Sequence, residues 1–94
     1  MDYKFLDKVV DMIVSETTID HDEERVYPPN SNDTNSYYFS PSSFPFYHFL
    51  TTHSPLPTFF YLHCRDVYGL NNEESKYVWE EYKIIITNKI KNNG

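Results

Sequence analysis

The residues most able to do chemistry in this 94-residue chain are a neighbouring histidine and cysteine, His63 and Cys64. A thiolate beside an imidazole can act as a nucleophile or as a metal ligand. Consecutive residues on a helix point about 100° apart, so the two side chains do not naturally face each other. Both also fall on a helix face that the apolar pattern predicts to be buried, where a free cysteine packs as a small hydrophobic side chain. We therefore favour a structural role for the pair.

A metal site would have to combine that pair with histidines of the central segment. The candidate ligands are His48, His53, His63 and Cys64. Zinc favours four nitrogen or sulfur ligands, commonly as two pairs at short spacings. His48 and His53 have the separation of one such pair, but no Cys-x-x-Cys motif accompanies them. We expect no metal and no cofactor, and keep a small metal-binding domain as an alternative function.

The acidic residues are concentrated at the N-terminal end of a chain whose formal net charge is −6. Residues 1–24 hold eight acidic and two basic side chains, whereas the remainder is neutral overall. Because Lys and Arg are few and scattered, we expect no direct nucleic-acid binding. A second alternative function is an acidic inhibitor of a nucleic-acid enzyme, although a solvated charge cluster is the favoured interpretation. The inhibitor's face would comprise Asp7, Asp11, Glu16, Asp20, Asp22, Glu23 and Glu24.

Other kinds of catalytic site find little support in the sequence. Gly69 and Gly94 are the only glycines, which excludes the glycine-rich loops that hold phosphate groups. No serine lies in a glycine-flanked nucleophile motif. A chain this short also has little structure with which to enclose a deep pocket. We therefore expect a non-enzymatic protein with no small-molecule substrate.

The first element of the fold is an amphipathic helix, predicted over about residues 2–17. Asp2 is placed to cap its N-terminus, where a carboxylate also meets the positive end of the helix dipole. Apolar residues recur at helical spacing and predict one buried stripe. The stripe consists of Leu6, Val9, Val10, Ile13 and Val14, widened by Phe5 and Met12.

Residues 26–64 carry a single side chain of the Asp, Glu, Lys or Arg type, Asp33, but hold all six prolines and eleven of the seventeen aromatic residues. Proline at this density prevents a regular helix and is poor in a central strand, while the aromatic content argues against disorder. We predict an ordered, irregular arm over about residues 26–53. Its rings either complete a thin core or bind another protein or a second copy. The candidate interaction residues are Tyr37, Tyr38, Phe39, Phe44, Phe46, Tyr47 and Phe49.

A hairpin of two helices is predicted over about residues 55–91. Ser54 can cap the first helix with Pro55 in its first turn, and Gly69 fits a left-handed C-terminal cap. The buried face of this helix would comprise Leu56, Phe59, Phe60, His63, Cys64 and Val67. Asn71 or Asn72 caps the second helix. The stripe of the second helix would comprise Val78, Tyr82, Ile85, Ile86 and Ile90, with Tyr77 and Trp79 at its edges.

Two stretches of the sequence resemble a group of small uncharacterised proteins of marine tailed phages. They are HCRDVYGLNNEESKYVWEEYKIIITNKI, which begins at His63, and DKVVDMIVSETTIDHDEERVYPP, near the N-terminus. Together they cover about half of the chain and leave residues 30–62, with most of the aromatic arm, unmatched. The resemblance implies a phage-related origin and carries no functional residues over to this sequence. It also implies that a nucleic-acid enzyme inhibited by the acidic face would belong to the host.

These patterns together predict a single mainly α domain, with an α+β fold as the alternative. In that alternative, Glu24–Tyr27 and Tyr47–Thr51 form short strands. The lone cysteine and the lack of an apolar leader or membrane segment predict a soluble cytoplasmic protein, in the host cytoplasm if phage-encoded. The expected function is a small non-enzymatic, phage-like protein that binds another protein or forms a homodimer.

Overall fold

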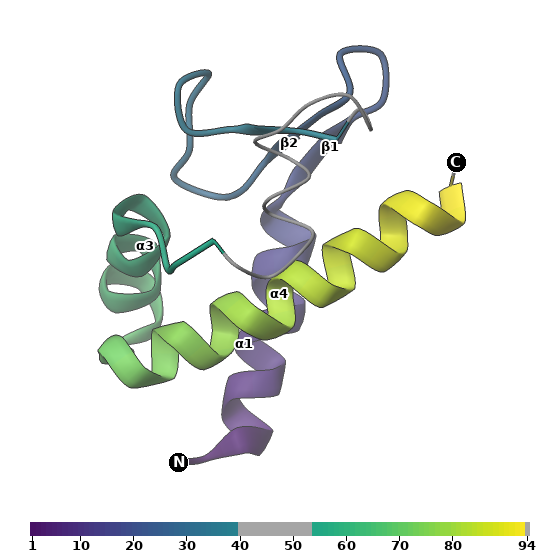
Figure 1. Ribbon diagram of the computed structural model, residues 1–94. Helices are drawn as coiled ribbons and strands as arrows, with labels where there is room; N and C mark the ends of the chain where they lie inside the picture. Colours follow the sequence, from purple (N-terminus) through teal and green to yellow (C-terminus); the bar gives the residue numbers. More distant parts are fainter. Residues whose placement is uncertain (40–53, 94) are drawn as a thin grey trace.

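A computed structural model describes residues 1–39 and 54–93 of the protein (Figure 1). The helices are α1 (Tyr3–Glu16), α3 (Thr58–Tyr68) and α4 (Asn72–Asn93). The strands are β1 (Thr18–Asp20), β2 (Arg25–Tyr27) and β3 (Tyr37–Tyr38), paired antiparallel in the order β1-β2-β3. The helix-rich character is confirmed, but the sheet makes the fold mixed and consistent with the α+β alternative. No helix among the described residues is long and apolar enough to span a membrane.

Helix α1 begins where its cap predicts. The Phe5 amide donates to the Asp2 carboxylate at 3.2 Å, which satisfies one of the unpaired amides of the first turn. Four of the five residues of the predicted stripe are buried, and they are Leu6, Val9, Val10 and Ile13. The fifth, Val14, is partly buried and packs against the core. The expected widening of the stripe is wrong, because Phe5 and Met12 are 44% and 50% exposed. The buried face of α1 is therefore narrower than the sequence pattern, because the helix that crosses it, α4, covers one side of α1 (Figure 1).

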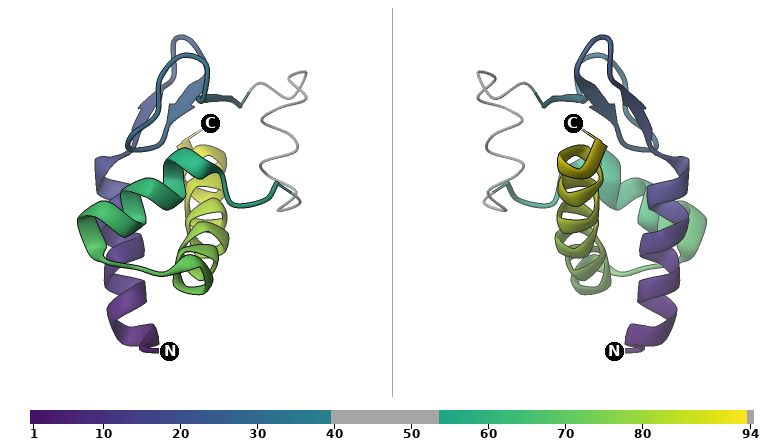
Figure 2. Two further views of the ribbon diagram at one scale, coloured as in Figure 1. Left: turned by 90° about the vertical axis from the view of Figure 1, so that its left-hand side faces the viewer. Right: turned by 90° about the vertical axis from the view of Figure 1, so that its right-hand side faces the viewer.

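The sheet follows α1 directly and lies at the end of the molecule opposite the N-terminus (Figures 1 and 2). The turn between β1 and β2 is held by Asp20, whose carboxylate accepts the amides of Asp22 and Glu23 at 3.0 and 3.1 Å. Glu24 completes the turn with a left-handed φ of 53°. Ile19 pairs with Val26, and Val26 pairs with Tyr37. Because side chains alternate across a strand, these three share the inner face.

The sheet corrects the expectation of an irregular arm from residue 26 onward. Strands β2 and β3 occupy part of that range, and β2 coincides with the first strand of the α+β alternative. Strand β1 was not predicted. The second strand of the alternative, Tyr47–Thr51, lies outside the described residues.

Helix α3 begins at Thr58, three residues after the predicted start at Pro55. The second proline is the physical reason, because Pro57 disfavours a helical conformation at Leu56. Pro57 itself is extended, with φ −73° and ψ 149°, and provides no side-chain cap. The predicted capping by Ser54 is therefore wrong. Its carbonyl oxygen instead accepts hydrogen bonds from Trp79 and Lys83 of α4, at 3.1 and 3.0 Å.

The connection between α3 and α4 follows the predicted caps. Gly69 has a left-handed φ of 70°, and the following Leu70 amide donates to the Cys64 carbonyl at 3.2 Å. Asn71 and Glu74 form a reciprocal capping box, each side chain accepting the other residue's amide, at 2.8 and 2.9 Å. The chain therefore reverses from α3 into α4 over a few residues.

The core lies where the three helices and the inner face of the sheet meet. Its aromatic centre is Phe60, whose ring centroid lies 4.8 Å from that of Trp79 and 5.1 Å from that of Tyr82. Lys83 is also fully buried, and its ammonium lies 3.1 Å from a Glu80 carboxylate oxygen. Val67 is 58% exposed, so its predicted burial is wrong. The last turn of α3 extends away from α4 before the chain reverses at Gly69 (Figure 2).

Candidate interaction surface

The first three candidate interaction residues of the arm fall on opposite sides of the sheet. The Tyr37 ring lies 6.2 Å from that of Trp79, and burial raises the pKa of its hydroxyl to about 12. Phe39 packs against the core, and its amide donates to the Glu24 carbonyl at 2.9 Å. Tyr38 points the other way and is 42% exposed. The other candidates lie outside the described residues, and they are Phe44, Phe46, Tyr47 and Phe49.

An arginine joins Tyr38 to a second tyrosine on the solvent side of the sheet. The guanidinium carbon of Arg25 lies 4.5 Å from the ring centroid of Tyr38 and 5.3 Å from that of Tyr27. This geometry is that of a cation–π contact. The guanidinium also donates to the Asp33 carbonyl and to the Ser36 hydroxyl, each at 2.5 Å. The loop between β2 and β3 therefore holds the arginine in place over both rings.

Strand register extends this cluster into a continuous surface. Asp20 pairs with Arg25 and Arg25 with Tyr38, while Thr18 pairs with Tyr27. Alternation places all of these side chains opposite the inner face. We call this surface the outer sheet face, and it consists of Thr18, Asp20, Arg25, Tyr27 and Tyr38. Of this set, the sequence indicated Tyr38 as an interaction residue and Asp20 as part of an acidic face. It did not indicate the contact of Arg25 with both tyrosines, because that contact requires the register of the sheet.

The neighbouring His63 and Cys64 have separate surroundings. Cys64 is fully buried, and burial raises the pKa of its thiol to about 11, so the thiolate is disfavoured. His63 instead reaches α1, where its Nε2 lies 2.8 Å from a Glu16 carboxylate oxygen. The Tyr68 hydroxyl donates to the other oxygen of the same carboxylate. The cluster of Glu16, His63 and Tyr68 links the end of α1 to α3.

Sequence reasoning missed the Glu16 cluster for a simple reason. Its partners lie 47 and 52 residues away along the chain, so no local spacing indicates the contact. Burial raises the pKa of Tyr68 to about 12, and its hydrogen bond to Glu16 adds to the shift. Tyr68 is therefore a hydrogen-bond donor at neutral pH, and the cluster acts as a clasp between two helices.

The predicted metal ligands are only partly within the described residues. His48 and His53 lie outside them. In the described ranges, no group of three or more His, Cys, Asp or Glu side chains is arranged to hold a metal ion.

Three of the seven carboxylates proposed for an acidic face bind other parts of the protein. Asp7 accepts a hydrogen bond from the Tyr77 hydroxyl at 2.7 Å, Glu16 forms the clasp, and Asp20 holds the turn between β1 and β2. The other four are exposed, and they are Asp11, Asp22, Glu23 and Glu24. Part of the acidity at this end therefore stabilises the fold.

Comparison with protein-family models, with curated proteins and with solved structures finds no match to this chain.

Proposed function

We propose that this protein is non-enzymatic and acts by binding a protein partner, either another protein or a second copy of itself. The outer sheet face is the proposed contact surface. The observation that carries the proposal is the stacking of the Arg25 guanidinium over the rings of Tyr27 and Tyr38. Tyrosine and arginine are the residue types that dominate the binding energy of protein interfaces.

The way this stack is held supports the proposal. A flexible arginine loses conformational entropy when a partner immobilises it, which weakens binding. Here hydrogen bonds to Asp33 and Ser36 already immobilise the guanidinium, so most of its conformational entropy is lost when the protein folds and little is lost on binding. Both bonds go to uncharged oxygen atoms, so neither bond neutralises the positive charge of the guanidinium in a protein of formal net charge −6.

Self-association is the first form of the proposal to test, by light scattering over a range of protein concentrations. We expect a mass that rises to that of a dimer and that returns to the monomer in Tyr38→Ala. The matched control is Phe5→Ala, which removes a ring of similar exposure from α1 and should leave the mass unchanged. A dimer that survives Tyr38→Ala would place the contact elsewhere.

A monomer at every concentration would leave a different protein as the partner. A photo-crosslinking residue at position 38, with position 5 as the control site, then tests the same surface in cells. We expect a discrete crosslinked product from position 38 only. Equal crosslinking from both positions, or none from position 38, would refute the proposal.

The origin and location remain part of the same proposal. The two stretches described above resemble phage proteins, so we place the protein in the cytoplasm of an infected host. The alternative functions have weaker support. Asp7, Glu16 and Asp20 are engaged within the fold, which reduces the carboxylates available to an acidic inhibitor.

A further inference from the structure

Two opposite charges lie side by side on the outer sheet face without neutralising each other. Asp20 of β1 and Arg25 of β2 are directly opposite in the strand register, so their side chains leave the same face of the sheet. The guanidinium lies over two tyrosine rings and donates to the loop between β2 and β3. The carboxylate instead accepts amides of the turn between β1 and β2. Among the described residues, neither charge belongs to an ion pair.

Each of these charges retains an atom that can bind another molecule. Both turn amides donate to Oδ1 of Asp20, and Oδ2 accepts no hydrogen bond from the described part of the chain. Arg25 donates to the loop through Nη2, and its Nε is buried without a partner. Nη1 is therefore the guanidinium nitrogen that is left to bind a partner. The face thus presents one acceptor with a negative charge beside one donor with a positive charge.

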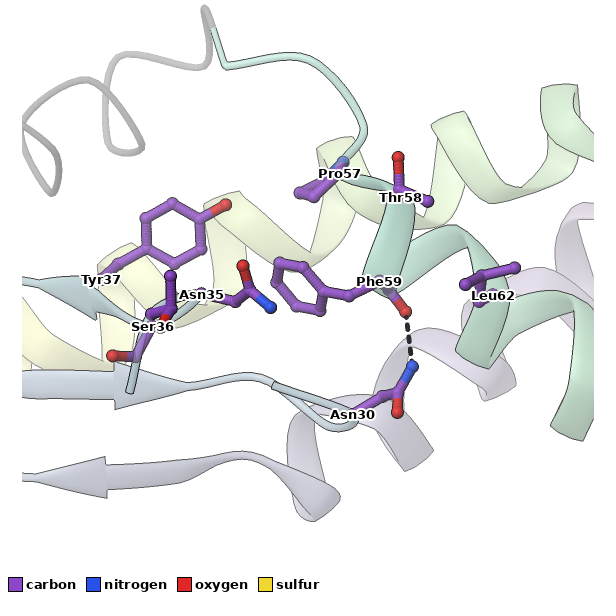
Figure 3. Close-up of a pocket in the computed structure, with 9 residues that line it drawn as sticks. Asn30, Asn35, Ser36, Tyr37, Pro57, Thr58, Phe59 and Leu62 are labelled. Atoms are coloured by element: carbon purple, nitrogen blue, oxygen red, sulfur yellow. Dashed lines mark hydrogen bonds between the residues drawn. The ribbon is translucent and has the colours of Figure 1, made fainter. Parts of the chain in front are cut away.

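The loop that holds the guanidinium is itself anchored to the helices. The Asn30 side chain donates to the Phe59 carbonyl of α3 at 3.0 Å (Figure 3). Further along the loop, the Asn32 side chain accepts the backbone amides of Thr34 and Asn35 at 2.9 and 3.1 Å. The guanidinium is therefore held in position before a partner arrives, which lowers the cost of binding.

A simple two-fold symmetry satisfies both charges at once. An axis that runs parallel to the strands, midway between β1 and β2, sets β1 of each copy against β2 of the other. Arg25 then meets Asp20 of the partner subunit, and the symmetry repeats this contact. The same axis places Tyr27 against Thr18 of the partner subunit, because these two residues are also directly opposite in the register.

We propose that the outer sheet face binds a second copy of this chain through two reciprocal ion pairs, each between Arg25 of one copy and Asp20 of the other. The inference rests on the proposed function and names the partner of that surface. The three strands have two or three residues each, so the contact area is small and the dimer belongs to the weak class of specific interfaces.

A partner of a single charge sign fits this face less well. An acidic surface would satisfy Arg25 but would bring like charge to Asp20, and a basic surface would do the reverse. A second copy supplies both signs in exchanged positions, because it carries the same two residues on the same face.

The net charge of the protein gives the inference a sharp test. Each copy has a formal charge of −6, and the proposed axis puts the two β1–β2 turns, with their exposed Glu23, at the same end of the dimer. Removing a carboxylate outside the ion pairs should therefore leave the dimer unchanged or tighten it. Removing the Asp20 carboxylate should weaken the dimer, because both ion pairs lose their anion.

The first experiment compares Asp20→Asn with Glu23→Gln by light scattering over a range of protein concentrations. Asparagine keeps a side-chain oxygen that accepts the turn amides, so the variant removes the charge and retains the turn. We expect Asp20→Asn to raise the dimer dissociation constant about tenfold, from about threefold for each of the two pairs. Glu23→Gln is the matched control, removes the same charge from the same turn, and should keep or lower the constant.

The second experiment reverses the charges. Asp20→Lys alone and Arg25→Glu alone each bring like charges together, so each variant should be a monomer. An equimolar mixture of the two variants should form a heterodimer, because every reversed charge then meets an opposite one. Amide NMR spectra of each variant establish that it is folded. If either variant is unfolded, the comparison of Asp20→Asn with Glu23→Gln decides.

Failure of this inference can be told apart from failure of the proposed function. A dimer that Tyr38→Ala abolishes but that is as tight in Asp20→Asn as in Glu23→Gln would refute the ion pairs alone. Two folded charge-reversal variants that stay monomeric when mixed would do the same. A monomer at every concentration would exclude the second copy, and a crosslink from position 38 would then uphold the proposed function. A dimer that survives both Tyr38→Ala and Asp20→Asn would overturn the inference and place the contact outside the outer sheet face.

Discussion

The thiol of Cys64 offers a quantitative test of whether the His63–Cys64 pair does chemistry. Burial raises its pKa from 9.0 to about 11. At any pH below 9, each unit of this rise lowers the thiolate fraction tenfold, so about a hundredth of the ordinary thiolate population remains. Because the side chain is fully buried, a reagent must also wait for the protein to open.

Burial slows the reaction of the Cys64 thiol more than its raised pKa does. A stability of about 5 kcal/mol, at the low end for a small domain, keeps the open fraction between about 10⁻⁴ and 10⁻³. We therefore expect a thiol reagent such as Ellman's to react with the folded protein at least a thousandfold more slowly than with protein in guanidinium. The rate should rise with denaturant in parallel with the unfolded fraction, because both report the same opening.

A surface thiol provides the matched control for this assay. In the double variant Cys64→Ala with Asn88→Cys, the only thiol lies at an exposed position of α4 and should react at the rate of a free cysteine. If Cys64 in the folded protein reacted at a comparable rate, the argument from burial would be refuted. That result would instead support a nucleophilic role for the His63–Cys64 pair.

Three further predictions concern stability. Phe60→Ala removes a fully buried ring that contacts Trp79 and Tyr82. Urea-induced unfolding should show a free energy of unfolding that is lower by about 3–5 kcal/mol. A loss below about 1 kcal/mol would contradict the place of Phe60 at the centre of the core. Gly69→Ala should cost about 1 kcal/mol in the same assay, entirely from the left-handed φ of 70°, because an added Cβ meets no atom within 4 Å. A stabilising effect would contradict that backbone geometry. The pKa of the Tyr37 hydroxyl is raised from 10.0 to about 12 on folding, so its contribution to stability is complete below pH 10 and is lost as the pH rises toward 12. Unfolding measured across this range should show stability falling with pH, and a smaller fall in Tyr37→Phe; an equal fall in the variant would exclude Tyr37 as a cause.

Local sequence signals predicted the helices well, because their determinants act within a few residues. Asp2 sits three residues before the amide that it caps, and Asn71 and Glu74 form their capping box over the same separation. Gly69 marks a backbone conformation that other residues adopt at a cost. Where a local signal failed, another one overrode it. Pro57 delayed the start of α3 that Ser54 and Pro55 had indicated.

Strand pairing was the main feature that the sequence could not supply. Strands of two or three residues show too little alternation to be recognised, and a polar turn such as that at Asp20 also occurs in many loops. Pairing of β2 with β3 brings Arg25 beside Tyr38, across the loop that separates the two strands. The outer sheet face therefore exists only in the folded chain.

The sequence by itself determined the positions of the helices, the acidic N-terminal quarter and the lack of charge in the central segment. The tertiary structure alone decided that Glu16 joins His63 and Tyr68, and that the Asn30 side chain donates to the Phe59 carbonyl (Figure 3). The physical reason is the separation along the sequence between the residues that interact. Caps and helical stripes depend on neighbours within two turns. The clasp and the Asn30–Phe59 hydrogen bond instead join segments separated by tens of residues, which only packing of the whole chain brings together.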